Sequence, residues 1–238
     1  MRRARAFLSG HVVVVSPHLD DAVLSLGATI AGATRLGARV EVLTVFAGDP
    51  TSGAPAGGWD TRAGFATESE AVLARRAEDD VACRRIGADA KWLQFPGGSY
   101  AGERGEQDAD AVWAAIAAAV AGADTALVPG FPLTNRDHAW LSELVDQREL
   151  PCRTGLYAEQ PYRYLVSGER RPAGLGWETS GVAISDYRRK WMAILAYTSQ
   201  LPLLGFTVRR RRKLKRLLLH EMVHGGEALA IPARSAGS

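Results

Sequence analysis

Short apolar runs alternate with longer segments of helical spacing over the first two thirds of the chain. Four consecutive valines at 12–15 are followed by a segment rich in small residues at 22–36 and by a second apolar run, VEVLTVF, at 40–46. A continuous run of β-branched residues predicts a strand that is buried on both faces, as in a parallel sheet. Because strand, helix and strand follow one another within about 35 residues, we expect a right-handed βαβ unit.

The same alternation continues toward the C-terminus. It predicts strands at 91–95, 126–129 and 155–159, and helices at 68–86, 108–121, 139–146, 186–196 and 208–220. Segments rich in Gly and Pro, at 48–64 and 167–179, are expected to be loops. This order indicates an α/β fold with a Rossmann-like, doubly wound, mostly parallel sheet, helices on both faces and a C-terminal helical elaboration. We expect one domain over 1–238, with its core at about 11–200 and a basic helix and tail at 201–238.

Composition narrows the classes of function. A hydrophobic content of 47% is enough for a full core without disulfides, and the two cysteines, Cys83 and Cys152, fit a reducing compartment. The net charge of +3 is too small to indicate nucleic-acid binding, and no window reaches the ~20 apolar residues of a membrane span. We therefore expect a cytoplasmic protein with a small-molecule substrate and no nucleic-acid or membrane partner. The sequence leaves open whether it forms a homo-oligomer.

Polar side chains follow two of the predicted strands, at the point where each strand ends. His18, Asp20 and Asp21 come after the valine run, and Asn135 and His138 follow the strand at 126–129. Open α/β sheets bind their ligands at the carboxyl ends of the strands. Together the loops offer His, Asp and His, which is the ligand set of a catalytic zinc with one open position and one carboxylate to spare. The same ligands suit Fe²⁺ or Co²⁺. Each loop taken alone is weaker evidence for a metal site, since paired Asp residues also cap helices.

These loops belong to an ordered set of motifs. The set consists of PHLDD at 17–21, RRAE at 75–78 before Gly87, NRDH at 135–138, YAEQPY at 157–162 and a lysine helix ending in YTSQ at 197–200. In this order they resemble the PIG-L (LmbE-like) family of zinc-dependent N-deacetylases over about residues 11–200. The resemblance implies that His18, Asp21 and His138 bind zinc. It also implies that Asp20 is the general base for a metal-activated water, which cleaves an acetamide to acetate and a free amine.

Two departures from the family pattern bear on the chemistry. Asn135 stands where the family often has a histidine that stabilises the oxyanion, and Tyr197 also replaces a histidine. An asparagine amide still donates an N–H to developing negative charge, but it does not act as an acid. Asn135 is therefore predicted to be a catalytic residue of this limited kind, and the proton for the leaving amine is expected to come from Asp20, another group or water. Tyr197 is expected to pack.

Three further residues are candidates for contact with the substrate: Arg75, Asp49 and Glu159. Each has a plainer alternative. Arg75 lies in a helical run that suits surface ion pairing, and Asp49 precedes Pro50 in a turn sequence. Glu159 follows a strand and suits an ion pair with Arg163, or the orientation of a metal-bound histidine.

We expect the substrate to be an N-acetylated amino sugar or glycoside, in natural-product or thiol biosynthesis. An amide in a thiol conjugate or an acylated natural product is the alternative within the same chemistry. A different class of function also fits the sequence. Residues 209–216 carry seven basic side chains, so a non-catalytic module could bind a partner through this helix. Leu214, Leu217 and Leu218 give the segment an apolar face, which instead favours docking on its own domain or on a neighbouring subunit. Metal content separates the enzyme from the binding module.

Overall fold

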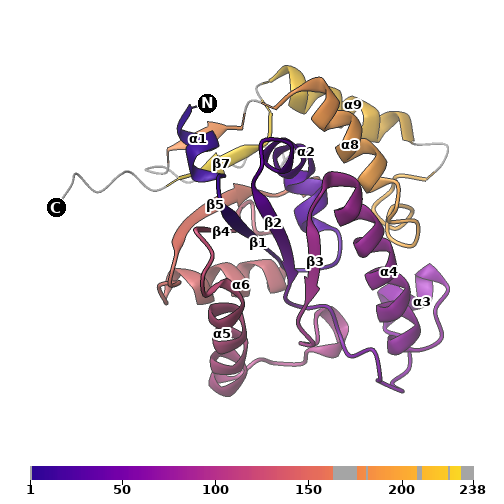
Figure 1. The fold of residues 1–238 in the computed structure, drawn as a ribbon. Helices are drawn as coiled ribbons and strands as arrows, with labels where there is room; N and C mark the ends of the chain where they lie inside the picture. Colours follow the sequence, from indigo (N-terminus) through magenta and orange to yellow (C-terminus); the bar gives the residue numbers. More distant parts are fainter. Residues whose placement is uncertain (1, 163–175, 181, 208–210, 225, 232–238) are drawn as a thin grey trace.

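A computed structural model describes residues 2–162, 176–180, 182–207, 211–224 and 226–231 of the chain, and it contains a seven-stranded sheet in the order β3-β2-β1-β4-β5-β7-β6. The parallel part consists of β1 (His11–Ser16), β2 (Arg39–Thr44), β3 (Asp89–Trp92), β4 (Thr125–Phe131) and β5 (Arg153–Ala158). At one edge, β7 (Ala228–Ala230) pairs antiparallel with β5 and with β6 (Trp177–Thr179). The α/β class and the mostly parallel sheet are confirmed (Figure 1).

The valine run shows why helices cover both faces. Val12 and Val14 point into one core layer, and Val13 and Val15 into the other, all at most 1% exposed. The first layer is filled from α2 (Asp21–Arg35), α4 (Glu68–Ile86) and α8 (Ile184–Ile194). The second layer is filled from α5 (Glu106–Val120) and α6 (Arg136–Asp146). Figure 1 shows the two groups of helices on opposite sides of the sheet.

Several elements differ from the sequence prediction. The expected loop at 48–64 contains a short helix, α3 (Gly58–Ala63), and the chain also forms α1 (Arg2–Phe7) and a 3₁₀ turn, η1 (Gly98–Tyr100). The strand expected at 91–95 begins two residues earlier, because β3 pairs with residues 41–44 of β2. The apolar residues that suggested the later position, Leu93 and Phe95, pack against the second core layer beyond the strand. Of the expected loop at 167–179, residues 167–175 lie outside the described residues and 177–179 form β6.

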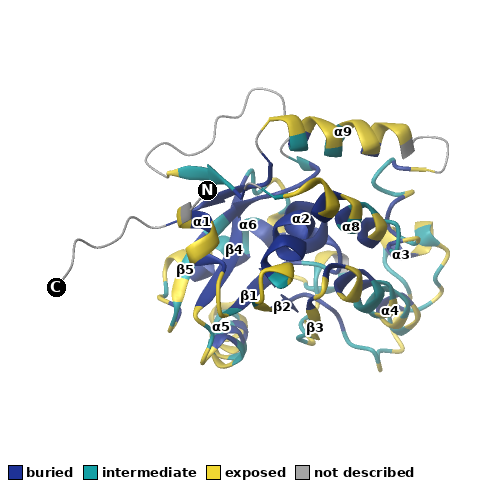
Figure 2. Ribbon diagram, turned by 45° about the horizontal axis from the view of Figure 1, so that its top comes forward, coloured by how far each residue is buried: buried dark blue, intermediate teal, exposed yellow. Residues whose placement is uncertain are grey.

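The basic helix α9 (Arg211–Val223) docks on its own domain. Leu214 is 3% exposed in the first core layer, and Leu217 and Leu218 pack against that layer. The basic side chains on the opposite face are exposed, as Figure 2 shows for most of the helix: Arg212, Lys213, Lys215 and Arg216. Residues 208–210 of the predicted helix lie outside the described residues. Within the part of the chain that the structure describes, every helix is too short or too polar to span a bilayer.

Candidate metal centre and active site

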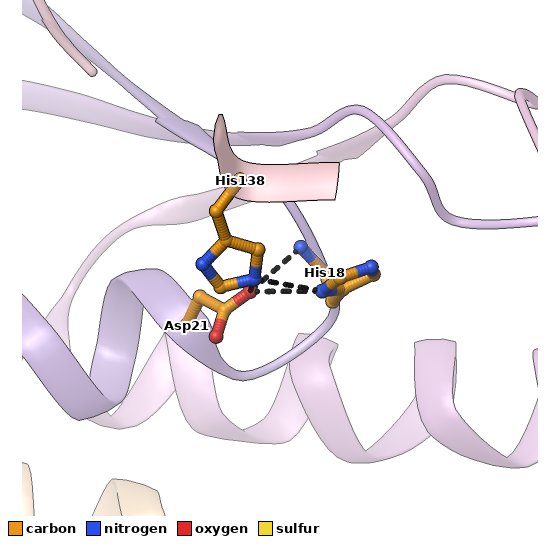
Figure 3. Close-up of side chains that lie close together, drawn as sticks. All are labelled: His18, Asp21 and His138. Carbon is orange, nitrogen blue, oxygen red and sulfur yellow. Dashed lines mark hydrogen bonds and ion pairs between the residues drawn. The ribbon is translucent and has the colours of Figure 1, made fainter. Parts of the chain in front are cut away.

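Three of the predicted side chains meet at one point beyond the carboxyl ends of β1 and β4 (Figure 3). His18 Nδ1 lies 3.0 Å from His138 Nε2 and 3.2 Å from Asp21 Oδ2, and His138 Nε2 lies 3.1 Å from the same carboxylate oxygen. A tetrahedral zinc with bonds of 2.0–2.1 Å separates its ligand atoms by about 3.3 Å. The three atoms are therefore spaced as the ligands of one small divalent ion.

The turn between β1 and α2 is closed by its own side chains. Ser16 Oγ donates to the carbonyl of His18 at 2.7 Å and accepts from the backbone N–H of Ala22 at 3.1 Å. The backbone N–H of His18 donates to Asp21 Oδ2 at 2.9 Å. These bonds fix the carboxylate of Asp21 toward the imidazole of His18, while Asp20 occupies the N-cap position of α2 and makes no capping bond with its side chain.

A carboxylate lies behind each histidine. His138 Nδ1 contacts Glu159 Oε1, and the backbone N–H of Leu133 donates to Glu159 Oε2 at 3.0 Å. His18 Nε2 lies 2.8 Å from Asp137 Oδ2. Because each outer nitrogen donates its proton to a carboxylate, each inner nitrogen presents a lone pair to the shared point. Two lone pairs and a carboxylate oxygen repel one another unless a cation lies among them, so this donor set fits a divalent metal.

The electrostatics of the cluster agree with this assignment. Burial by itself lowers the pKa of His18, but hydrogen bonds to Asp137 and Asp21 outweigh burial and raise it to about 9. Burial likewise lowers the pKa of His138, while Asp21 and Glu159 raise it to about 11. Burial by itself raises the pKa of Asp21, yet the two histidines hold this pKa well below the usual range. The carboxylates thus stabilise positive charge at this point, whether ring protons or a metal ion.

A cavity of about 290 Å³ opens beside the cluster. Its lining includes His18, Asp20, Asp21 and Asn135. The other lining residues are Leu19, Phe46, Ala47, Gly48, Trp59, Asp60, Glu68, Val72, Arg75, Gly97, Gly98, Tyr100, Tyr162, Gln200 and Leu204. The carboxylate of Asp20 belongs to a residue that is only 8% exposed, and burial, followed by the charge of Asp21, raises its pKa well above the ordinary value. A buried carboxylate with a raised pKa beside a metal site is suited to accept a proton.

The three residues predicted to contact the substrate, Arg75, Asp49 and Glu159, have different positions in the structure. Arg75 lines the cavity, and its Nη2 lies 2.5 Å from Asp60 Oδ1. Asp49 is outside the cavity lining, and its Oδ1 accepts hydrogen bonds from the backbone and hydroxyl of Thr51, as the turn alternative expects. Glu159 is 1% exposed and contacts His138, which agrees with the orienting role that the sequence left open. The alternative partner, Arg163, lies outside the described residues.

Sequence reasoning assigned no role to Asp60, Tyr100 or Asp137. Asp137 lies inside the NRDH motif, and its position next to the predicted ligand His138 is the sequence signal that could have identified it as part of the site. Asp60 lies in the segment expected to be a loop, where Tyr100 Oη donates to Asp60 Oδ2 at 2.7 Å and accepts from the backbone N–H of Gly57 at 2.6 Å. No sequence pattern brings these distant residues together. Tyr197 packs as expected: it is fully buried and donates to Asp79 Oδ1 at 2.7 Å.

Comparison with known proteins gives a consistent result. A family model described as PIG-L, GlcNAc-PI de-N-acetylase, matches residues 13–148. Among solved structures, the A40926 pseudoaglycone deacetylase Dbv21 is 29% identical with a TM-score of 0.78, over 95% of this chain and 98% of that chain. A zinc-inhibited form of the teicoplanin deacetylase Orf2 is 25% identical with a TM-score of 0.76, over 96% of this chain and 100% of that chain.

A more distant likeness extends to an N,N'-diacetylchitobiose deacetylase from Pyrococcus horikoshii. It has a TM-score of 0.60 at 17% identity, over 94% of this chain and 82% of that chain, which shows a common fold. A search of curated protein sequences finds no significant match.

Proposed function

The chain belongs to the PIG-L family of GlcNAc-PI de-N-acetylases, and from this premise we propose that it is a metal-dependent N-deacetylase acting on an N-acetylated amino sugar or glycoside. The products are acetate and a free amine. The observation that carries the proposal is the convergence of His18, Asp21 and His138 beside a cavity that also holds Asp20. The relatives named as deacetylases of A40926 pseudoaglycone and teicoplanin support a glycoside substrate.

His18, Asp21 and His138 would hold the metal, with zinc as the expected ion and Fe²⁺ or Co²⁺ suited to the same ligands. When bound, the metal polarises the amide carbonyl and lowers the pKa of a water molecule toward neutrality. Asp20 then accepts the proton of the attacking water and passes it to the departing amine.

Asn135 would stabilise the developing oxyanion. Its Oδ1 accepts from the backbone N–H of Asp137 at 2.9 Å, as the N-cap of α6. With the oxygen committed to the helix, the amide nitrogen is the atom left to face the cavity that Asn135 lines. The cap thus fixes which end of the amide is a donor at the reaction centre.

The cavity wall suits a sugar. The aromatic side chains of Trp59 and Tyr100 would contact the apolar side of a pyranose, and Arg75 and Asp60 would contact its hydroxyls. About 290 Å³ is at the lower end of the range for small-molecule sites, so we infer that the N-acetyl sugar enters and that a larger aglycone stays at the mouth.

The test is primary-amine release from a panel of N-acetylated sugars, glycosides and thiol conjugates, with measured metal content. We expect about one metal per chain and turnover on at least one glycoside. Asp20→Asn keeps the metal and loses about 10²–10⁴ in kcat, because a general base contributes about that factor. His138→Ala loses the metal. Asp80→Asn, an exposed carboxylate that pairs with Arg84 on α4, is the matched control and changes neither.

The controls decide between classes of function. Turnover confined to thiol conjugates would replace the proposed glycoside substrate with a thiol conjugate and would leave the proposed amide hydrolysis intact. A purified chain that holds no divalent metal at neutral pH, even after loading, would contradict the proposal and favour the binding module. Because one relative has a zinc-inhibited form, activity is measured at one equivalent of zinc and in excess.

A further inference from the structure

Arg104 is a buried cation close to the metal centre, in the segment between η1 and α5. Its side chain is 12% exposed. Its Nη1 donates to Asp137 Oδ1 at 2.7 Å, and its Nη2 donates to the carbonyl of Pro96 at 3.2 Å. Arg104 does not belong to the described lining of the cavity, and its two polar partners, Asp137 and Pro96, are also outside that lining.

Two aromatic rings hold the guanidinium in place. Its Cζ lies 4.2 Å from the ring centroid of Phe46 and 4.9 Å from that of Trp140. The two rings are themselves 6.0 Å apart and tilted by 54°. A guanidinium bound to a carboxylate and packed against two ring faces has little freedom to move.

Asp137 connects this cation to a metal ligand. Its Oδ1 is held by Arg104, while its Oδ2 lies 2.8 Å from His18 Nε2 and accepts from the backbone N–H of Gly98 at 2.7 Å. Both oxygens are thus committed, and the plane of the carboxylate is fixed. A fixed carboxylate fixes the direction of the His18 N–H and the plane of the imidazole.

We propose that Arg104 is a positioning residue for the metal centre, which acts through Asp137 to present Nδ1 of His18 to Asp21 and His138. The inference rests on the proposed metal-dependent function. Without Arg104 the buried Asp137 loses its charged partner and turns toward other donors, so the His18 ring loses its orientation. The role concerns metal affinity, and the affinity for substrate stays unchanged.

The experiment measures the zinc dissociation constant of the full chain by competition with a chelator, together with the visible absorption of the Co²⁺-loaded protein. Outer partners of metal ligands typically contribute 10–100-fold to metal affinity, and Arg104 lies one contact further out. We therefore expect Arg104→Met to weaken zinc binding about tenfold and to shift the Co²⁺ bands, with KM unchanged in metal-saturated enzyme. Arg104→Lys keeps the charge but lacks the second guanidinium nitrogen, so its zinc affinity is expected to lie between those of Arg104→Met and the wild type.

Two comparisons isolate the mechanism. Arg35→Met removes a similar forked pair, in which Arg35 contacts Asp186 at 3.0 and 2.8 Å, and is expected to leave zinc affinity unchanged. In a double-mutant cycle, Arg104→Met added to Asp137→Asn is expected to change the affinity little further, because the effect passes through Asp137.

The outcomes separate this inference from the proposed function. Zinc affinity and Co²⁺ bands equal to those of the wild type in both Arg104 variants, or additive effects in the cycle, would overturn the positioning role and leave the proposed function intact. Failure of the wild type to bind any divalent metal would overturn both. If Arg104→Met does not fold, the affinity and spectrum of Arg104→Lys decide the question.

Discussion

Carboxylates behind the two histidines determine which ring nitrogens face the candidate metal centre. His138 presents Nε2 because Glu159 contacts Nδ1, and His18 presents Nδ1 because Asp137 contacts Nε2. The sequence predicts the histidines themselves, since each belongs to a polar motif that follows a buried strand. It does not predict their tautomers, because the carboxylate that contacts each ring lies 21 or 119 residues away.

Asn135 gives the sharpest test at this scale. Asn135→Asp keeps an oxygen that caps α6 but removes the amide N–H groups, so we expect kcat to fall by about 10²–10³ with metal content and melting temperature unchanged. Steady-state kinetics and thermal unfolding measure the two effects. Asn135→Ser, which also caps a helix, serves as a second variant. Full activity in both variants would show that Asn135 is only a cap.

The ends of α4 follow local signals, whereas the position of β3 follows strand pairing. The helix α4 spans the residues expected for it, because Thr67 accepts from the backbone N–H of Glu70 at its start and Gly87 adopts a φ of 81° at its end. The strand β3 is offset from its predicted position because its register is set by β2. The three-residue strands β6 and β7 carry no such signal, and they were not predicted.

Asp79, on α4, makes the free energy of unfolding depend on pH. Burial is the main cause that raises the pKa of Asp79 to about 6, although Trp92 and Tyr197 donate hydrogen bonds that act downward. The unfolded chain has the ordinary value near 3.8, so the folded chain binds this proton more tightly and its stability falls as pH rises between the two values.

We therefore expect Asp79→Asn, which cannot ionise, to gain stability relative to the wild type as pH rises. The gain is about 2 kcal/mol between about pH 4.5 and about pH 7.5. Denaturant unfolding at several pH values measures it. Asp110→Asn, an exposed carboxylate on α5, is the control and is expected to show little change with pH. A difference between Asp79→Asn and wild type that stays constant with pH would contradict the assignment.

At the scale of the whole molecule, the candidate metal centre joins two parts of the chain. His18 and His138 are 120 residues apart: His18 lies on the loop after β1, and His138 lies in the first turn of α6, which follows the neighbouring parallel strand β4. A second long-range cluster fixes the C-terminal segment, where buried Lys190 donates to Glu221 Oε2 at 2.8 Å and to Glu227 Oε1 at 2.6 Å. This cluster joins α8 to α9 and to the approach to β7.

Metal binding is accordingly expected to stabilise the whole fold. A ligand that binds only the folded state at about 100 times its Kd adds about 2.7 kcal/mol, or about 5–10 °C in Tm for a domain of this size. Differential scanning calorimetry of chelator-treated protein, with and without zinc, measures the shift. His138→Ala is expected to show none. An unchanged Tm in the wild type at saturating zinc would contradict a site that exists only in the folded chain.

The sequence by itself determined the layers of the fold and the three side chains that meet at the candidate metal centre, His18, Asp21 and His138. Valine runs, helix caps and polar residues just beyond strand ends are local patterns, and local patterns are set by near neighbours in the chain. Tertiary structure alone decided the carboxylates behind the histidines, the contact of Asp60 with Arg75, and the antiparallel edge strands. Each of these depends on segments that meet only when the chain folds, and no periodicity in the sequence records which segments meet.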